Sequence, residues 1–293
     1  MTDKKHLVFI INPKSGVDRQ KAIQHAIDTR LDNGKYSYEI AYTQRAKHGI
    51  ELAREAASKG AYVVVAVGGD GSVNDVMKGL LRTNTALAII PKGSGNGVAR
   101  TFHIPLDVYR AIDLINRDNV ANVDIGFAND SPFISNAGTA FDALIAREFA
   151  ASKRRGLIAY SWLVTKHLWA YREREWSITI DGKEIREKAF MVNVANCRQF
   201  GYNFQIAPQA DWTDGIFDIV IIKKFPKLLG GGLVWRAMNG TLTGSRYVSH
   251  YRGRHVVIRH PDMDAMQVDG DLLQCESTVD FRIECGIQKV LVP

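Results

Sequence analysis

Gly68-Gly69-Asp70-Gly71-Ser72-Val73-Asn74-Asp75 is the stretch around which the first half of this sequence is organised. An apolar, β-branched run at 61–67 precedes it and is typical of a buried parallel strand. Apolar residues at helical spacing follow, namely Val73, Val76, Met77, Leu80 and Leu81. The pattern therefore predicts a strand, a glycine turn and a helix. Such a turn either binds an anion at the helix N-terminus or simply links two elements, with Asp70 or Ser72 as the N-cap.

Composition places the chain among globular proteins. Its 293 residues suggest two domains, and its 46% hydrophobic and 24% charged residues are ordinary values. The net charge of +7 permits attraction to anionic lipids or nucleotides. No RNA-binding or zinc-finger pattern occurs, so we do not expect nucleic acid as a partner. Three cysteines without metal-binding spacing, no signal-peptide pattern and no long apolar span predict a cytoplasmic protein with reduced thiols.

Strands and helices alternate along the first half of the chain. Helix-like segments separate strand-like runs at 7–11, 36–42, 61–67 and 87–90. This alternation predicts a parallel sheet with helices on both faces. Turn-rich loops at 12–16, 68–74 and 91–97 follow three of the strands, and such loops share the edge of the sheet where ligands bind. Together they predict a phosphate-binding edge, although the chain has no Walker A loop and no GxGxxG after its first strand.

Three motifs carry a resemblance to a known family: Asn12-Pro13-Lys14-Ser15-Gly16, the stretch 68–76 and Pro91-Lys92-Gly93-Ser94-Gly95-Asn96. In order and spacing they resemble the motifs of the diacylglycerol kinase catalytic family, which includes sphingosine kinases and bacterial lipid kinases. The family's usual threonines are serines here, at 72 and 94, so both hydroxyl groups are kept. The resemblance implies that Asp70 lies beside Mg²⁺ or the accepting hydroxyl as a catalytic residue. It also implies that ATP is bound by Asn12, Pro13, Lys14, Ser15, Gly16, Thr43, Gly68, Gly69, Asp70, Gly71, Ser72, Val73, Asn74 and Ser94.

The second half of the chain has a different pattern. From about residue 120, strand-like segments dominate and predict a largely antiparallel domain. The resemblance implies an α/β N-terminal domain of the NAD kinase and phosphofructokinase type, with a parallel sheet, followed by a β-sandwich. We therefore expect an ATP-binding domain at 1–122, to which residues 286–293 return, and a lipid-substrate domain at 123–285.

A helix-like segment at 157–171 is rich in aromatic residues and follows the basic run Lys153-Arg154-Arg155. This combination suits a membrane interface, whereas an aromatic stripe is more often part of a core. The sequence leaves both interpretations open. The triplet Gly230-Gly231-Gly232, between apolar residues, presents a similar choice between a hinge over an acyl chain and a simple break.

Two acidic elements of the second half also match the family. Asp142, in Gly138-Thr139-Ala140-Phe141-Asp142, resembles the GxGFDA element, which implies that it faces the lipid head group; a helix N-cap is the alternative. The run 211–216 resembles the structural Mg²⁺ loop of bacterial lipid kinases. Asp214 would supply its carboxylate, and Asp211 and Ile216 their backbone carbonyls. From the residues alone, the run is equally consistent with an Asp-Gly turn.

The catalytic base is expected in Val268-Asp269-Gly270-Asp271, which resembles the family's Asp-Gly-Glu element with Asp271 at the glutamate position. A carboxylate there can accept the proton of the attacking hydroxyl. Because aspartate is one methylene shorter than glutamate, the sequence leaves open whether Asp269 or Asp271 is the base. Without a cleft, Asp-Gly is an ordinary hairpin turn.

These elements predict an ATP- and Mg²⁺-dependent kinase that acts on a primary hydroxyl of a diacylglycerol-like or sphingoid lipid. The expected partner is a lipid substrate at the membrane surface, which the chain visits as a peripheral protein; a homodimer is left open. Two alternatives remain, a soluble-substrate kinase of the NAD kinase type and a non-catalytic lipid-binding regulatory protein. The lipid itself is not predicted, because acyl pockets are lined by generic apolar residues.

Overall fold

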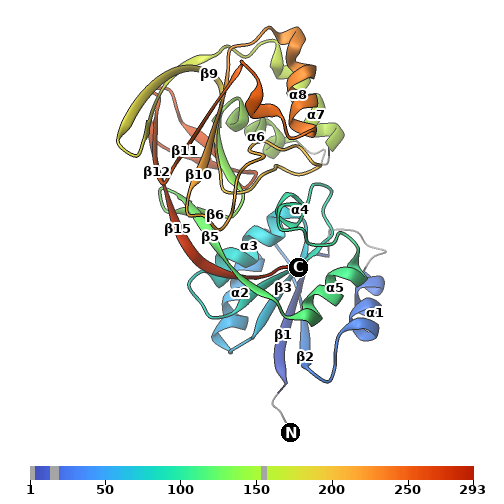
Figure 1. Cartoon of the computed structure of the whole chain (residues 1–293). Coiled ribbons are helices and arrows are strands. Elements are labelled where there is room, and N and C mark those ends of the chain that lie inside the picture. Colours follow the sequence, from blue (N-terminus) through green and yellow to red (C-terminus); the bar gives the residue numbers. More distant parts are fainter. Residues whose placement is uncertain (1–3, 14–19, 153–156) are drawn as a thin grey trace. The chain divides into compact units, whose positions relative to one another are not determined.

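The computed structural model describes residues 4–13, 20–152 and 157–293 (Figure 1). The chain forms two compact units: unit 1 comprises Met1–Val123 and Gly286–Pro293, and unit 2 comprises Asp124–Cys285. These boundaries lie within one residue of those expected from the sequence. Among the described residues, no helix combines the length and apolar character needed to cross a bilayer.

Unit 1 contains a parallel sheet in the order β2-β1-β3-β4. Its strands are β1 (Lys5–Ile11), β2 (Tyr36–Tyr42), β3 (Val63–Gly68) and β4 (Ala86–Pro91). All residues of β3 and β4 are buried, as expected for central strands covered on both faces. The strand order runs outward in one direction from β1 to β2 and in the other direction from β3 to β4, so it reverses between β1 and β3. In such sheets ligands bind at this switch point, at the carboxyl ends of the strands.

Five helices accompany this sheet: α1 (Gln20–Arg30), α2 (His48–Ser58), α3 (Asp70–Leu80), α4 (Gly97–Thr101) and α5 (Val108–Arg117). The helices α2 and α3 pack against each other on one face, and α1 and α5 pack together on the other (Figure 1). Gly79 allows the close approach on the first face, because a Cβ there would lie 2.5 Å from the carbonyl oxygen of Ile50. The α/β part of the predicted fold is confirmed.

Unit 2 is built from antiparallel strands around the long strand β9. One part of β9, 183–189, pairs with β8, and the other part, 189–195, lies between β7 and β10. The strands are β5 (Val120–Ala128), which begins in unit 1, β6 (Ser131–Phe133), β7 (Asn136–Ala140), β8 (Arg174–Ile180), β9 (Lys183–Ala195), β10 (Phe217–Lys223), β11 (Val248–Gly253), β12 (His255–Arg259), β13 (Ala265–Val268), β14 (Asp271–Gln274) and β15 (Thr278–Leu291). The strand β15 ends in unit 1, where Val290 lies parallel to Leu87 of β4.

Two hydrophobic cores stabilise unit 2, and β10 contributes to both. Phe217, Ile219 and Ile221 point into the core between the strands, while Val220 and Ile222 point into a second core beneath the helices. This alternation follows from the period of two in a β-strand. The helical elements are α6 (Phe141–Ala151), α7 (Leu157–Leu168), η2 (Lys227–Leu229), α8 (Gly230–Met238) and η3 (Leu242–Gly244). Unit 2 therefore has the predicted sandwich-like architecture, with an added helical layer.

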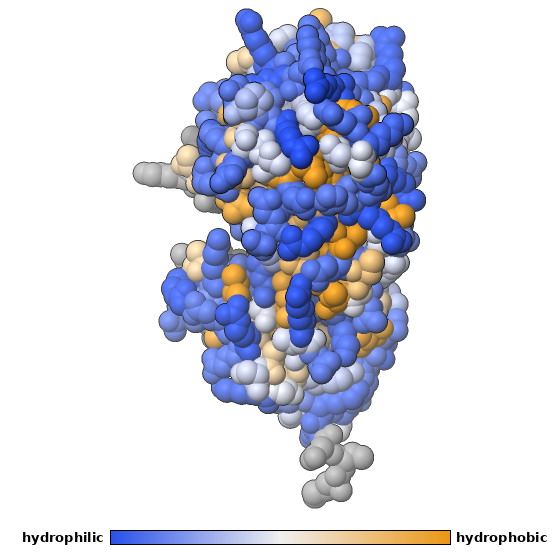
Figure 2. All heavy atoms as spheres, turned by 90° about the vertical axis from the view of Figure 1, so that its left-hand side faces the viewer, coloured by the Kyte–Doolittle hydropathy of each residue, from blue (hydrophilic) through white to orange (hydrophobic). Residues whose placement is uncertain are grey.

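The outer side of β9 is polar where it pairs with β8. Lys183, Glu184, Arg186 and Lys188 are all exposed. Figure 2 shows the side of the molecule on which β9 lies in Figure 1, and hydrophilic residues predominate there. This side therefore has the surface expected for a sheet that faces water.

Candidate active site

The loops at the carboxyl edge of the unit 1 sheet meet as the topology requires. The Thr43 N–H donates to the Ile11 carbonyl at 3.0 Å, which fixes the residue after β2 beside the end of β1. The Asn12 N–H donates to the Val67 carbonyl at 3.3 Å and ties the residue after β1 to β3. Three of the predicted ATP ligands, Asn12, Thr43 and Gly68, thus lie on adjacent strands at the switch point.

Two glycines allow the loop after β3 to touch the loop after β4. A Cβ on Gly93 would lie 2.5 Å from the Gly69 Cα, and a Cβ on Gly69 would lie 3.1 Å from the Gly93 Cα. The Lys92 N–H also donates to the Gly68 carbonyl at 2.7 Å. The backbones are therefore in contact, and any side chain at either position would separate them.

Asp70 stabilises the same pair of loops from within. Its Oδ1 accepts a hydrogen bond from the Val98 N–H at 3.1 Å, at the start of α4. Burial raises the pKa of the Asp70 carboxyl above its ordinary value, and hydrogen bonds from the backbone at 96–98 and from its own N–H act in the opposite direction. Asp70 therefore connects the turn before α3 with the loop before α4, a role that the sequence did not predict.

The outer surface of the glycine turn remains open at Gly71. Among the described residues, no heavy atom lies within 4 Å of the position that its Cβ would take. Ser94 is exposed, whereas the side chains of Val73 and Asn74 are buried in α3. An anion at this turn would meet the N-terminus of an 11-residue helix. The predicted ligands Lys14, Ser15 and Gly16 lie outside the described residues, and Pro13 is the last described residue before them.

In unit 2, Asp269 and Gly270 form the two-residue turn of the β13–β14 hairpin. Their φ angles of +50° and +85° are those of a type I′ turn. The Asp269 carboxylate accepts hydrogen bonds from the N–H groups of Ile134, Ser135 and Asn136, at 2.8–3.2 Å. This carboxylate therefore holds the start of β7 in place.

Asp271, the first residue of β14, is exposed and differs from Asp269 in this respect. Its side chain makes no hydrogen bond or ion pair within the part of the chain that the structure describes. The turn that carries it is fixed by Asp269 and by a hydrogen bond of 2.8 Å from the Gly270 N–H to Gln267 Oε1. Asp271 is thus a free carboxylate on a rigid support.

Asp142 belongs to a buried polar network at the start of α6. Its Oδ2 accepts hydrogen bonds from Gln267 Nε2 at 3.0 Å and Asn193 Nδ2 at 3.3 Å. The same two amides donate to Asn136 Oδ1. Gly138 makes room for the carboxylate, because a Cβ at this position would overlap with Asp142 Oδ2. Burial raises the pKa of Asp142 to about 6, although both hydrogen bonds act to lower it.

Sequence reasoning missed the three amides of this network, Asn136, Asn193 and Gln267. Asn193 gave a signal, because it is a single amide in the otherwise apolar run 189–195. Gln267 links Asp142 to the hairpin that carries Asp271. The network thus connects two of the predicted site residues within unit 2.

The raised pKa of Asp142 predicts a pH dependence for unit 2. The folded state binds this proton more tightly than the unfolded chain, so its contribution to stability falls as the pH rises from about 4 to about 6. Asp142→Asn should therefore raise the free energy of unfolding at pH 7 by about 2 kcal/mol, and the gain should shrink toward pH 4. All five tryptophans lie in unit 2, so denaturant titrations followed by tryptophan fluorescence measure it. A loss of stability at pH 7 would contradict the prediction.

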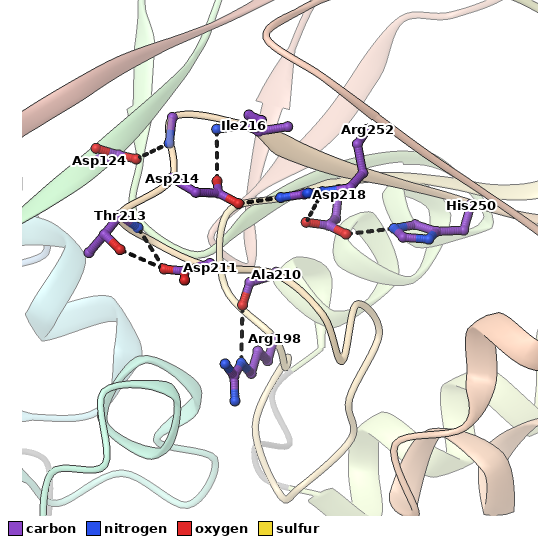
Figure 3. A network of polar contacts seen from close by, with 11 residues as sticks. Asp124, Arg198, Ala210, Asp211, Thr213, Asp214, Ile216, Asp218, His250 and Arg252 are labelled. Carbon is purple, nitrogen blue, oxygen red and sulfur yellow. Dashed lines mark hydrogen bonds and ion pairs between the residues drawn. The ribbon is translucent and has the colours of Figure 1, made fainter.

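The residues predicted for a structural Mg²⁺ lie together in the loop before β10 (Figure 3). Asp214 Oδ1 accepts a hydrogen bond from the Ile216 N–H at 3.0 Å, and its Oδ2 accepts one from the guanidinium of Arg252. Asp211 Oδ1 accepts from the N–H and the hydroxyl of Thr213, at 3.0 and 2.7 Å. Both oxygens of Asp214 therefore already have protein donors.

Arg252 lies between two carboxylates of this region (Figure 3). Besides Asp214 it faces Asp218, with 3.8 Å between Arg252 Nε and Asp218 Oδ2. Asp218 is fully buried, and its other oxygen lies 2.5 Å from His250 Nε2. Within 4–13, 20–152 and 157–293, no group of three or more His, Cys, Asp or Glu side chains could hold a metal ion. Arg252 is thus a positive charge that stands beside Asp214, and it is an alternative to Mg²⁺ at this position.

This alternative predicts how Mg²⁺ affects unit 2. Because Arg252 neutralises Asp214, the melting temperature should be equal in Mg²⁺ and in EDTA. Arg252→Ala should destabilise unit 2 by about 1–2 kcal/mol, a value reduced by the partial exposure of the pair, and Mg²⁺ should then recover part of the loss. Tryptophan fluorescence is again the readout, and Arg254→Ala, which removes an exposed arginine nearby, is the control. A melting temperature that rises with Mg²⁺ in the unaltered protein would support the predicted metal site instead.

Comparisons with known proteins agree with this division of the chain. Residues 6–128 match the family model of the diacylglycerol kinase catalytic domain, and residues 135–292 match that of the YegS C-terminal NAD kinase beta sandwich-like domain. A protein of Chromohalobacter salexigens named "Probable lipid kinase YegS-like" is 30% identical over 75% of this chain and 72% of its own length. The diacylglycerol kinase of Bacillus subtilis is 26% identical over 91% of this chain and 90% of its own length.

Solved structures show the same fold. A diacylglycerol kinase from Bacillus anthracis str. Sterne superimposes with a TM-score of 0.75 at 21% identity, covering 100% of this chain and 98% of that one. An NAD kinase from Archaeoglobus fulgidus in complex with ATP gives a TM-score of 0.55 at 13% identity, covering 98% and 93%. Because the two family models together span almost the entire sequence, the chain belongs to the diacylglycerol kinase catalytic-domain family of lipid kinases.

Proposed function

We propose that this protein transfers the γ-phosphoryl group of ATP, together with Mg²⁺, to a primary hydroxyl of a diacylglycerol-like or sphingoid lipid. The observation that carries the proposal is the free carboxylate of Asp271, held on a hairpin that Asp269 and Gln267 make rigid. The relatives named diacylglycerol kinase and lipid kinase support the choice of acceptor.

Unit 1 supplies the features needed for ATP. Phosphates would lie against the open backbone at Gly71 and the N-terminus of α3, where N–H groups and the helix dipole attract anions. The hydroxyls of Ser72 and Ser94 and the side chains of Asn12 and Thr43 stand on the same edge as further donors. The solved NAD kinase with this fold is in complex with ATP, which supports ATP as the phosphate donor.

The carboxylate of Asp70 is the group at this edge that suits Mg²⁺. Its Oδ1 accepts the hydrogen bond of the Val98 N–H, and further backbone N–H groups at 96–98 face the same carboxyl group. A hard cation prefers such carboxylate oxygens together with phosphate oxygens. When bound, Mg²⁺ would neutralise the charge that develops on the phosphates. Asp70 would orient the ion and also keep the two glycine loops together.

Unit 2 supplies the groups for the acceptor. In the reaction, the hydroxyl oxygen forms a bond to the γ-phosphorus while the bond to the bridging oxygen of ADP breaks. The hydroxyl proton passes to Asp271, which then releases it to water. The carboxylate of Asp142, which the amides of Gln267 and Asn193 hold in place, would accept a hydrogen bond from a polar group of the lipid head. The rest of the rate enhancement would come from positioning the phosphate donor, ATP, against the hydroxyl group of the lipid.

The proposal is tested by phosphoryl transfer from [γ-³²P]ATP to a total lipid extract in detergent micelles, with and without Mg²⁺. Separation of the lipids should reveal a labelled, Mg²⁺-dependent product whose identity names the acceptor. A parallel reaction contains NAD⁺ in place of lipid, because an NAD kinase shares the fold. Label in NAD⁺ alone would overturn the proposal in favour of a soluble acceptor. Tight ATP binding without any labelled product would point to a regulatory lipid-binding protein.

A further inference from the structure

The helical layer of unit 2 has large apolar side chains on its outside. The exposed fractions reach 60–65% for Trp162, Trp169 and Trp235 and 85% for Leu228, with 40–48% for Leu229, Val234 and Met238. These seven residues are called the apolar ridge below. The sequence left open whether the aromatic helix at 157–171 lies in a core or at a membrane. The structure gives the two faces of α7 different roles, because Leu163 is buried while Trp162 is exposed. Trp169, directly after the helix, is exposed as well.

The ridge is one continuous layer. Its two helices lie side by side (Figure 1), and a Cβ on Gly230 of α8 would lie 3.4 Å from Leu168 at the end of α7. An ion pair of 2.8 Å between Lys227 and Glu173 joins the same ends. The inner faces of both helices are buried in the same core, through Leu163 and Leu233. The outer faces therefore point away from the protein together.

The two segments that carry the ridge contain only cationic charges, one of which, Lys227, is paired with Glu173. Residues 157–172 and 223–247 contain no Asp or Glu, although these account for 31 of the 293 residues. The same segments contain seven cationic side chains: Lys166, Arg172, Lys223, Lys224, Lys227, Arg236 and Arg246. Lys166 of α7 lies between Trp162 and Trp169 in the sequence, and its ammonium is 5.3 Å from the centre of the Trp162 ring. A positive rim around apolar side chains matches an anionic bilayer.

A basic hollow is formed partly by the residues that lead into the ridge. It is lined by Arg186, Glu187, Lys188, Lys223, Lys224, Arg246 and Tyr247. Its single carboxylate, Glu187, accepts hydrogen bonds from Ser249 and Tyr251. Arg186 pairs with Glu184, and the other four cations have no ion pair among the described residues. Lys224 is only four residues from Leu228 of the ridge. A phosphate-bearing head group could occupy the hollow while the ridge enters the acyl boundary.

We propose that the apolar ridge and the basic hollow form a docking surface for an anionic phospholipid bilayer. The inference extends the proposed function, because a lipid acceptor is presented at a membrane. Lys and Arg stems would lie along the apolar layer with their charges at the head groups, and the tryptophans would lie at the interface. A second copy of the chain is a poor occupant, since two positive rims would repel each other.

The test is co-sedimentation with vesicles of phosphatidylcholine alone or of equal parts phosphatidylcholine and phosphatidylglycerol, without ATP. The protein should bind the mixed vesicles and lose binding at high salt.

Lys223→Gln/Lys224→Gln should lower the partition coefficient about 25-fold on mixed vesicles, at about fivefold per charge. Trp162→Ala and Trp235→Ala should each lower it about tenfold. The controls are Lys183→Gln/Arg254→Gln, which changes the charge equally in unit 2, and Tyr109→Ala, which removes an exposed aromatic ring from α5.

Equal losses with the charge control would show that the net charge alone drives binding, and would overturn the docking surface. Self-association that Trp235→Ala abolishes would assign the ridge to a second copy instead. A further measurement separates docking from catalysis: phosphoryl transfer to a water-dispersed short-chain diacylglycerol should be unchanged in the ridge variants, while transfer to diacylglycerol in vesicles falls. If no lipid is phosphorylated in either form, the proposed function fails and the sedimentation result still decides the docking surface.

Discussion

Asp271→Asn is expected to lower the turnover number by about 10²–10⁴-fold and to leave the ATP dissociation constant and the stability unchanged. The range is that of a positioned general base. Stability should not change, because Asp271 is exposed and its side chain has no hydrogen bond or ion pair in the described part of the chain. Steady-state transfer of labelled phosphate, calorimetric ATP binding and a tryptophan-monitored melting curve measure the three quantities.

Two further variants separate the candidates for the base. Asp271→Glu keeps a carboxylate and introduces the residue that the family pattern has at this position, so it should retain most of the turnover. Asp269→Asn should lower the melting temperature, because the Asp269 carboxylate accepts three backbone hydrogen bonds that a neutral amide would accept more weakly. If Asp271→Asn keeps full turnover, and Asp269→Asn loses it without a change in melting temperature, the assignment must be reversed.

The contrast between these two aspartates shows what the sequence could not predict. The Asp-Gly-Asp motif identified the hairpin, but both carboxylates remained candidates because their neighbours were unknown. The partners of Asp269 are backbone groups at 134–136, more than 130 positions earlier in the chain. Every residue except proline has a backbone N–H, so the residue types in a motif do not reveal this contact. The buried network around Asp142 was missed for a different reason, because its three side-chain amides lie on β7, β9 and β13 and are far apart in the sequence.

The parallel sheet and the glycine loops after β3 and β4 were predicted because their signals are local. Buried parallel strands have continuous apolar runs, as β3 and β4 do, and the turns after them contain glycine. The loop at 211–216 was different. Its sequence suggested a metal, and the structure places the guanidinium of Arg252, from β11, beside its carboxylate. Local turn chemistry alone does not reveal which cation a carboxylate meets.

The second prediction with a large effect concerns two glycine-to-alanine substitutions in the loops after β3 and β4. Gly93→Ala should lower turnover about 10²-fold and destabilise unit 1 by about 1–3 kcal/mol. Its Cβ would lie 2.5 Å from the Gly69 Cα and 2.8 Å from Asn96 Oδ1, so the two loops must separate. Hydrogen exchange in peptides covering 63–80 and 91–97 should increase, which locates the change in these loops.

Gly71→Ala is the matched variant, and it should raise the stability of unit 1, whereas Gly93→Ala should lower it. Its Cβ would meet no heavy atom of the described residues within 4 Å, and an alanine in α3 should stabilise the helix by about 0.5–1 kcal/mol. If phosphates lie against this backbone, the same methyl group should weaken ATP binding at least tenfold, because overpacking costs about 1–3 kcal/mol. Calorimetric titration with ATP measures this loss. Unchanged ATP affinity in Gly71→Ala would place the nucleotide elsewhere on unit 1. If both variants lose ATP affinity and hydrogen exchange increases only in Gly93→Ala, Gly93 shapes the loops and Gly71 faces the ligand.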